Sequence, residues 1–187
     1  MSATVWVRKL GGCWFAVALN NQNELVCSTL SIKGESDLQS SLDRALHRYN
    51  RLEGQANSHA NRLLDAMYKM YEGKPALIDQ KLSTRFITPF YQAVYRKTRN
   101  IPRGLVTTYG LLARSAGSKR LSRAVGNAMA ANPFVLIVPC HRVVRSALEV
   151  GNYGRGPELK RELLKREGVL FTGRKISEAS VWMPQDR

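Results

Sequence analysis

The segment "FVLIVPCHRVV" at residues 134–144 places three reactive side chains directly after an apolar run. The run itself has the length and composition of a buried strand. Pro139 ends it, and a thiol (Cys140), an imidazole (His141) and a guanidinium (Arg142) follow. A structural cysteine needs no such neighbours, whereas a nucleophilic cysteine needs a base or positive charge to become a thiolate. We therefore treat Cys140 as a candidate nucleophile and His141 as its candidate base.

This interpretation requires a bend in the chain. Neighbouring side chains of an extended strand point to opposite faces, so Cys140 and His141 can cooperate only if the strand ends between them. Pro139 favours such a bend. The residues alone also allow two other readings of Cys140: an inert core thiol, or a metal ligand together with His141. Directly adjacent residues rarely chelate one zinc ion, and no second cluster of Cys and His lies nearby.

Length and composition narrow the class of protein. The chain has 187 residues, of which 44% are hydrophobic, so it can bury the core of one compact domain or two small ones. Its three cysteines do not form a disulfide scaffold in a chain of this length. No apolar run approaches a transmembrane helix, and the first residues lack a signal-peptide pattern. We expect a cytoplasmic protein, or a nuclear one in a eukaryote, without a membrane partner.

The positive charge is concentrated in the second half of the chain. Residues 85–187 carry 19 Lys and Arg against 6 Asp and Glu, whereas residues 1–84 carry 10 against 8. The net charge of the whole chain is +15. A half this basic indicates a polyanionic partner, most simply nucleic acid. The alternative is a basic surface that serves solubility.

The first part of the chain predicts a small α/β domain. Residues 4–32 alternate like three strands of an antiparallel meander, with turn residues between them. Residues 36–72 show helical periodicity, interrupted at residues 53–58, which indicates two helices. A polar connector with Gly and Pro closes this part. We place the N-terminal α/β domain, antiparallel strands plus helices, at residues 1–82 with the connector.

The second part predicts a mostly helical domain at residues 83–171, followed by a polar and poorly ordered tail at residues 172–187. Two short helices on either side of Gly117-Ser118-Lys119 fit a helix-turn-helix. The second of them, "RLSRAVGNAMAAN" (residues 120–132), carries arginines at its start and small residues along its length. Such a helix packs closely against another helix or against a DNA groove.

Capping residues mark the ends of the helices in this part. Thr88 with Pro89 begins one helix, and Thr107 or Thr108 caps the next. Pro157 and Gly168 bound the last helix, with Glu167 in its final turn. On its own, Glu167 is typical of a solvated carboxylate at a helix end.

Taken together, these motifs resemble the alkylguanine-DNA alkyltransferases, also called methylated-DNA–protein cysteine methyltransferases. The resemblance extends from about residue 88 to residue 168. Its motifs stand in a consistent order: Ile101-Pro102, Thr108-Tyr109-Gly110, Arg123-Ala124-Val125-Gly126, Asn132-Pro133, Pro139-Cys140-His141-Arg142-Val143, Tyr153 and Glu167. The N-terminal part matches in general outline only, and the resemblance implies a ribonuclease H-like domain there.

The resemblance implies DNA repair by a suicide protein. An alkyl group would pass irreversibly and stoichiometrically from O6 of guanine, and less well from O4 of thymine, to Cys140. His141 would act as base through a water, Glu167 would hold His141, and Asn132 would hold the turn before Cys140. The target base would be flipped out through the minor groove of double-stranded DNA carrying alkylated guanine. The free protein would be monomeric.

The resemblance also assigns residues to the DNA and to the flipped base. Arg123 would fill the gap that the base leaves, and Tyr109 would contact the phosphate or the base and protonate the departing guanine. The residues implied for DNA contact are Arg123, Tyr109, Arg120, Ala124, Gly126 and Ala128. The residues implied for the base pocket are Tyr153, Val150, Gly151, Gly154 and Tyr109.

This chain departs from the family pattern at several places. Residues 146–150, "SALEV", stand where the family commonly has an Asp-Gly or Asn-Gly turn, which bears on the breadth of accepted alkyl groups. Residues 119–122 are more basic than usual, which favours phosphate contact. Some relatives bind zinc through Cys and His of the N-terminal domain. The residues available for that here lack ligand spacing, so we expect no metal and no other cofactor; they are Cys13, Cys27, His47 and His59.

A disulfide between Cys13 and Cys27 is a further alternative, although pairing of the two strands about residues 20–24 does not place these cysteines opposite each other.

Two other functional classes also stay open. A lesion sensor would flip the base without chemistry, but relatives of that kind lack the cysteine. A thiol hydrolase would turn over many times, but no signature of an oxyanion hole or an Asp-directed triad supports it.

Overall fold

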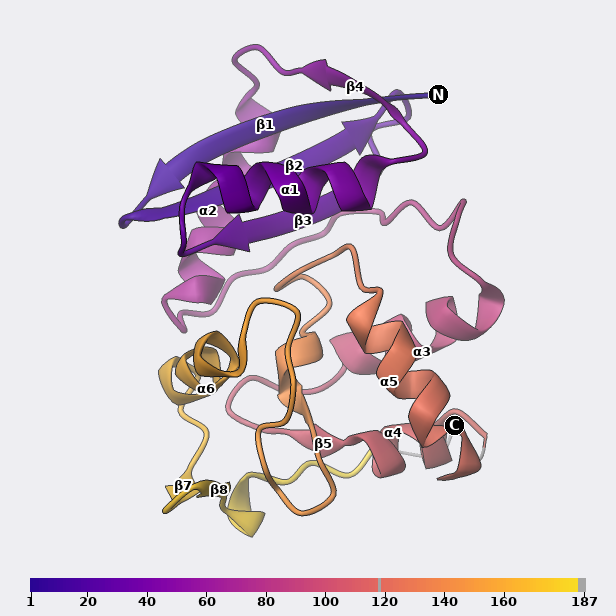
Figure 1. Ribbon diagram of the computed structural model, residues 1–187, viewed down its shortest axis with the longest axis vertical. Coiled ribbons are helices and arrows are strands. Elements are labelled where there is room, and N and C mark those ends of the chain that lie inside the picture. Colours follow the sequence, from indigo (N-terminus) through magenta and orange to yellow (C-terminus); the bar gives the residue numbers. More distant parts are fainter. Residues whose placement is uncertain (118, 185–187) are drawn as a thin grey trace. The chain divides into compact units, whose positions relative to one another are not determined.

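The computed structural model describes residues 1–117 and 119–184 and divides into two compact units (Figure 1). The first unit comprises Met1–Met70, Ala76–Phe86 and Pro133–Ile137. The second comprises the intervening segments and the chain from Val138 onward. The chain therefore passes between the units more than once, whereas the sequence predicts a single passage near residue 82.

The first unit contains a four-stranded sheet in the order β3-β2-β1-β4. The three strands of the expected meander pair antiparallel, and β4 adds to β1 in parallel. The elements are β1 (Ser2–Leu10), β2 (Cys13–Asn20), β3 (Leu25–Ser31), α1 (Glu35–Leu46), β4 (Asn50–Glu53) and α2 (Ser58–Tyr71). The sequence did not predict β4, because its four residues are mostly polar and exposed and lack an apolar pattern.

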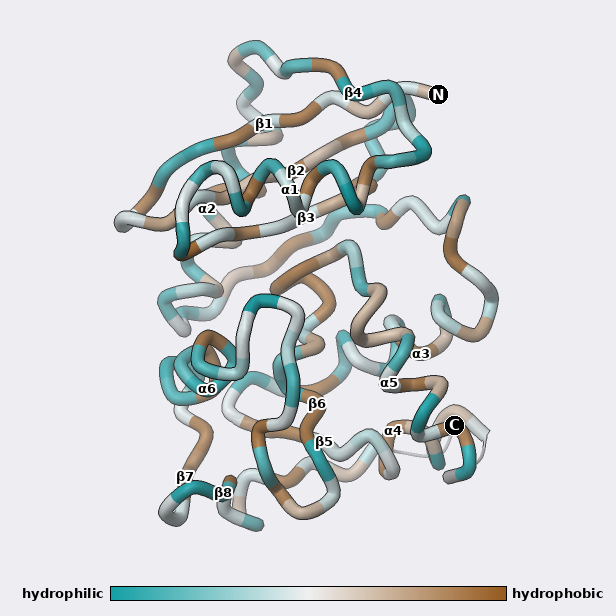
Figure 2. Tube along the Cα trace, in the orientation of Figure 1, coloured by the Kyte–Doolittle hydropathy of each residue, from teal (hydrophilic) through white to brown (hydrophobic). Residues whose placement is uncertain are grey.

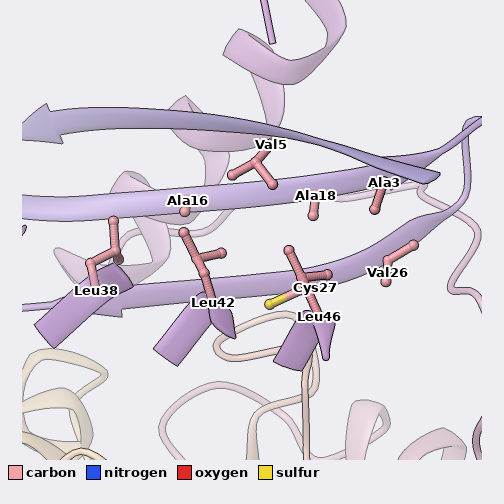
Figure 3. Close-up of a cluster of buried hydrophobic side chains, with 9 residues drawn as sticks. All are labelled: Ala3, Val5, Ala16, Ala18, Val26, Cys27, Leu38, Leu42 and Leu46. Atoms are coloured by element: carbon pink, nitrogen blue, oxygen red, sulfur yellow. The ribbon is translucent and has the colours of Figure 1, made fainter. Parts of the chain in front are cut away.

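The two helices of this unit cover opposite faces of the sheet (Figure 1). On one face, Leu38, Leu42 and Leu46 of α1 follow a four-residue spacing and pack onto small residues of the strands (Figure 3). On the other face, Tyr68 of α2 packs edge-on against Phe15, with ring centroids 5.9 Å apart. Side chains that alternate along the strands thus pack against a helix on each face of the sheet.

The apolar run at residues 134–138 is not a strand, so that expectation was wrong. It forms a buried turn, in which Leu136 has a φ of 69°, and it is coloured brown in Figure 2. Only Phe134 pairs in strand fashion, through an isolated bridge to Ser28. Val135 N–H donates to the carbonyl of Ser28 (3.0 Å), and the Ser28 hydroxyl donates to the carbonyl of Val135 (2.9 Å). A run of apolar residues indicates that a segment is buried, and both strands and buried turns can have such a run.

The second unit is mostly helical. Its elements are α3 (Pro89–Arg99), β5 (Thr107–Thr108), α4 (Tyr109–Ser115), η1 (Lys119–Leu121), α5 (Ser122–Ala130), η2 (Cys140–Arg142), β6 (Val143–Val144), α6 (Pro157–Arg166), β7 (Phe171–Thr172), β8 (Lys175–Ile176) and η3 (Glu178–Ser180). The predicted caps are present: the hydroxyls of Thr88 and Thr108 accept hydrogen bonds from the N–H groups of Tyr91 and Leu111. The turn of the expected helix-turn-helix includes Ser118, which lies outside the described residues, so that motif stays a prediction.

The C-terminal segment is packed over residues 171–182, contrary to the expectation of a poorly ordered tail, and residues 185–187 of that expected tail lie outside the described residues. The strands β7 and β8 form a small antiparallel pair, and Ile176 and Ser180 are buried. A few apolar residues, among them Ile176, hold this segment in place. They are too few to form a pattern, so the polar composition of the segment predicted disorder. Within the described ranges, no helix combines the length and the apolar character that a bilayer crossing requires.

Candidate active site

The chain bends at Pro139, as the chemistry of Cys140 and His141 requires. Pro139 has φ −77° and ψ 63°, and Cys140 N–H donates to the carbonyl of Val138 at 2.7 Å. These are the features of an inverse γ-turn. The 3₁₀-helix η2 follows, with Arg142 N–H donating to the carbonyl of Pro139. Cys140 and His141 are therefore not fixed on opposite faces of a strand, and both are buried.

Glu167 joins η2 to the end of α6. His141 Nε2 lies 2.9 Å from Glu167 Oε1. Arg142 grips the same carboxylate with two nitrogens, Nε to Oε2 at 2.8 Å and Nη2 to Oε1 at 2.7 Å, and its Nη1 donates to the carbonyl of Ile101. Two-pronged arginine–carboxylate bonds fix orientation as well as charge. Glu167 is thus a buried orienting group and not a solvated helix-end carboxylate.

The electrostatics of Glu167 decide which nitrogen of His141 is available as a base. Burial raises the pKa of Glu167, but the charge and hydrogen bonds of His141 and Arg142 outweigh it and lower the pKa to about 2. An ionised carboxylate only accepts hydrogen bonds, so Nε2 of His141 is the donor. The second ring nitrogen, Nδ1, is buried without a hydrogen-bond partner among the described residues. This nitrogen is placed to take a proton.

The Cys140 thiol is 6% exposed, and burial raises its pKa. Hydrogen bonding from Asn132, the positive charge of Lys160 and the hydroxyl of Tyr153 act in the opposite direction without cancelling the effect of burial. The thiol is therefore protonated at neutral pH, and a base must remove its proton before it can attack.

Asn132 supports the bend from the end of α5. Its Nδ2 donates to the carbonyl of Val138 at 3.0 Å, which is the same carbonyl that closes the γ-turn. The side chain also stabilises a thiolate at Cys140. Asn132 thus contacts the turn and the nucleophile together.

Lys160 is a site residue that the sequence analysis missed. Its side chain is fully buried, Nζ donates to the carbonyl of Val143 at 2.7 Å, and Nζ lies 5.8 Å from the centroid of the Tyr109 ring. Burial lowers the pKa of Lys160 to about 8, against the attraction of Cys140. A signal was present in the sequence, because Lys160 precedes Leu163 and Leu164 by three and four residues and so falls on the buried face of α6. Arg142 was also missed as a partner of Glu167.

Tyr109 reaches the site through a short parallel strand pair. Thr107 and Thr108 of β5 pair with Val143 and Val144 of β6, directly after η2. Tyr109 is the next residue and begins α4. Burial and the nearby Cys140 raise the pKa of Tyr109, so its hydroxyl keeps its proton at neutral pH and acts as a donor.

The loop that was expected to border the base pocket contains Tyr153, which lies close to Cys140. The Tyr153 hydroxyl lies beside the Cys140 thiol, and burial together with that thiol raises the pKa of Tyr153 well above the usual value. Val150 is buried, whereas Gly154 is exposed. Gly151 has a φ of 73°, and a Cβ there would come within 3.1 Å of the Arg145 side chain. The positive φ favours glycine at this position.

The helix α5 exposes a face that begins with Arg123. Arg123 and Asn127 are exposed, and Gly126 has open space where a side chain would stand. An open hollow lies over the start of this helix, and its lining residues are Arg120, Leu121, Ser122, Arg123, Ala124 and Asn127. Ser122 and Asn127 were not among the expected residues. Ala128 was wrongly placed on this face: it is fully buried, and its carbonyl accepts a hydrogen bond from the Tyr95 hydroxyl at 2.9 Å.

The candidate zinc ligands and the candidate disulfide do not come together. Cys13 and Cys27 are both buried thiols. Cys13 is paired with Leu10 across β1 and β2, whereas Cys27 is paired with Ala18 across β2 and β3. Among the residues that the structure describes, no three His, Cys, Asp or Glu side chains gather closely enough to hold a metal ion.

Residues 89–169 match the family described as "6-O-methylguanine DNA methyltransferase, DNA binding domain". This region, which is less than half of the chain, is therefore similar to the DNA-binding domain of the 6-O-methylguanine DNA methyltransferases. The methyltransferase match contains every residue of the Cys140, His141 and Glu167 array, together with Asn132 and Tyr153. The resemblance inferred from the sequence motifs is thereby confirmed.

Relatives of known name agree with this methyltransferase assignment. A methylated-DNA–protein-cysteine methyltransferase of Saccharolobus islandicus is 42% identical over 99 residues, covering 53% of this chain and 63% of the relative. The chain thus spans less than two thirds of the length of that relative. The O6-methylguanine-DNA methyltransferase of Pyrococcus kodakaraensis superposes with a TM-score of 0.68 at 28% identity, over 89% of this chain and 99% of that one. OGT of Mycobacterium tuberculosis, solved in complex with DNA, gives 0.70 at 25% identity over 88% and 92%.

Proposed function

We propose that this protein repairs DNA by accepting the alkyl group of O6-alkylguanine, and less well of O4-alkylthymine, on the sulfur of Cys140. The observation that carries the proposal is the buried array of Cys140, His141 and Glu167, in which His141 Nδ1 has no hydrogen-bond partner among the described residues while its other nitrogen is bonded to Glu167. The match of residues 89–169 to a methyltransferase family supports the same chemistry.

The transfer begins with the proton of the thiol. His141 Nδ1 takes it from Cys140 through a bridging water, and the charge that forms on the ring is stabilised by Glu167 across the 2.9 Å contact. The thiolate then attacks the alkyl carbon. A carbon–sulfur bond forms as the carbon–oxygen bond at O6 breaks, and the electron pair of that bond stays on guanine.

The departing guanine receives a proton from Tyr109, whose raised pKa keeps the hydroxyl protonated until the base becomes negatively charged. Tyr153 packs on the base, and the backbone at Val150 and Gly151 borders it. The product is S-alkylcysteine. Restoring Cys140 would require its thiolate to leave the alkyl carbon, and a thiolate is a poor leaving group there, so the protein acts once per lesion and its substrate is consumed in a one-to-one ratio.

The alkylated base reaches the buried sulfur by leaving the DNA stack. O6 of a stacked guanine lies on the major-groove edge of the base, out of reach of a thiol that is buried in the protein, so the nucleotide must be flipped out to contact Cys140. In this proposal α4 and α5 form a helix-turn-helix, and the exposed face of α5 enters the minor groove. Arg123 occupies the space that the base leaves. Arg120 contacts phosphate, and Asn127 is an additional donor toward the groove, since both line the hollow at the start of α5.

The test is the mass of the intact protein after incubation with O6-benzylguanine or with a duplex that contains O6-methylguanine. We expect one alkyl group per protein chain, located in the peptide that contains Cys140. Cys140→Ala should gain no mass. The matched control is Cys27→Ala, which removes another buried thiol and should be alkylated like the wild-type protein.

Other outcomes would contradict the proposal. Alkylation of Cys140→Ala would place the acceptor elsewhere. Tight binding of the lesion without a mass change would indicate a lesion sensor, and release of more than one product molecule per chain would indicate a hydrolase.

A further inference from the structure

The C-terminal segment, residues 170–182, holds two separate parts of the second unit. The first is Val106, which directly precedes β5. Val106 N–H donates to the carbonyl of Ser180 at 2.8 Å, and Trp182 N–H donates to the carbonyl of Val106 at 2.6 Å. Val106 and Val181 thereby form a parallel bridge. Because Tyr109 follows Val106 by three residues, the segment fixes the strand that carries Tyr109 to the site.

The second part is the turn at residues 145–149. Arg145 N–H donates to the carbonyl of Glu149 (3.1 Å), and Leu148 N–H donates to the carbonyl of Arg145 (3.0 Å). Leu148 has a φ of 58°, an unfavourable value for leucine. Ile176 N–H donates to the carbonyl of Leu148 at 2.8 Å. This turn leads directly into Val150 and the loop with Tyr153.

One apolar cluster joins these two parts. It includes Ile176, which is 2% exposed, together with residues that come before β5, from β6 and α6, from the turn and from the C-terminal segment: Val106, Val144, Leu148, Val150, Leu164, Val169, Phe171 and Val181. The leucine side chain in this cluster explains why a strained φ is kept at residue 148. A glycine would fit the backbone without strain but would give up the contact with the C-terminal segment.

We infer that residues 170–182 are a brace that positions the base-binding groups Tyr109 and Tyr153 around Cys140, with Ile176 and Leu148 as its positioning residues. This inference rests on the proposed function. The brace does not touch the thiol or His141. It sets the distance between the strand before Tyr109 and the loop before Tyr153, and reacting groups that shift by a fraction of an ångström lose rate steeply. Loosening the brace should therefore weaken the binding and positioning of the guanine base, while the intrinsic reactivity of the thiol stays the same.

The test compares Ile176→Ala with the conservative Ile176→Val and with Lys175→Ala, an exposed neighbour in the same strand. Two rates are measured for each protein. Alkylation by O6-benzylguanine at increasing concentrations gives a half-saturating concentration, and alkylation of Cys140 by iodoacetamide reports the thiol without the base pocket. All assays are run below the onset of thermal unfolding of each variant.

For Ile176→Ala we expect the half-saturating concentration of O6-benzylguanine to rise about tenfold, with the iodoacetamide rate within about twofold of the wild-type rate. Ile176→Val should recover most of the loss, and Lys175→Ala should behave like the wild-type protein. If Ile176→Ala does not fold, Leu148→Gly serves instead, since it relieves the strained φ and removes the same contact.

An unchanged half-saturating concentration in a folded variant would overturn the brace, and so would an equal fall of both rates, which indicates general damage to the site. These outcomes differ from a failure of the proposed function itself, in which the wild-type protein gains no benzyl group at all.

Discussion

Two buried thiols of this chain, Cys27 and Cys140, occupy very different surroundings. Cys27 lies on β3 in an apolar cluster beneath α1, with Ala18, Leu42 and Leu46 among its members (Figure 3). Cys140 is just as inaccessible, but polar groups surround it: Asn132, Tyr153 and Lys160 act on its thiol, and His141 follows it in the chain. Burial by itself favours the neutral thiol in both places.

The comparison teaches that a nucleophilic thiol is made by its polar neighbours. A site that hides the sulfur from water must also supply a route for the proton and a charge that stabilises the thiolate. In the proposed mechanism of Cys140, His141 Nδ1 provides the route and Lys160 provides the charge. Each of the following experiments removes one of these differences between the two thiols.

Loss of the base should have the largest effect. His141→Phe keeps a planar ring in the buried space but removes Nδ1, so we expect alkyl transfer from O6-benzylguanine to slow by about 10²–10⁴-fold. The rate of mass gain of the intact protein measures this. Cys27→Ala is the control and should stay within about twofold of the wild-type rate. A His141→Phe protein that reacts within tenfold of the wild-type rate would show that Cys140 needs no more help than a core thiol does.

Loss of the orienting carboxylate should appear in stability and in its pH dependence. The pKa of Glu167 falls from 4.5 to about 2 on folding. Its stabilisation is therefore fully present above pH 4.5 and is lost as the pH falls toward 2, which corresponds to about 3 kcal/mol. Urea unfolding at several pH values should show this loss in the wild-type protein.

Glu167→Gln should be less stable at pH 7 by a similar amount, and its stability should fall less between pH 4.5 and pH 2. The matched control is Glu162→Gln, a carboxylate on the surface of the same helix, half exposed and paired with Arg166. That pair should contribute less than about 1 kcal/mol. Equal pH profiles for the wild-type protein and Glu167→Gln would contradict the assigned pKa.

Loss of the buried charge should have the smallest effect. Lys160→Met preserves most of the volume but removes the ammonium group that stabilises the Cys140 thiolate, so we expect about tenfold slower alkylation at pH 7. Lys160 has a pKa of about 8 and is charged below that value. The difference between variant and wild-type rates should therefore shrink as the pH rises above 8.

The pH profile of alkylation by iodoacetamide measures this directly. Lys165→Met, an exposed lysine of the same helix, is the control and should follow the wild-type profile. A ratio of rates that stays constant from pH 6 to pH 10 would show that Lys160 acts through packing and not through charge.

Local sequence patterns determined much of this protein. The meander β1–β3 followed from alternation and turn residues, and the helix starts at Thr88 and Thr108 followed from capping, because these signals depend on neighbours in the chain. The motifs around Cys140 also predicted the similarity to the methyltransferases that residues 89–169 show. All of these features are encoded within a few residues of where they act.

Tertiary structure alone decided the rest. The run before Cys140 is a turn and not a strand, because its apolar residues report burial and not backbone conformation. Glu167 and Lys160 became parts of the site only when α6 folded against η2, more than 15 residues away in the chain. Ala128 and the C-terminal brace were misjudged for the same reason. Whether a side chain is buried, and whether a polar group finds a partner, depends on segments that meet only in the folded protein.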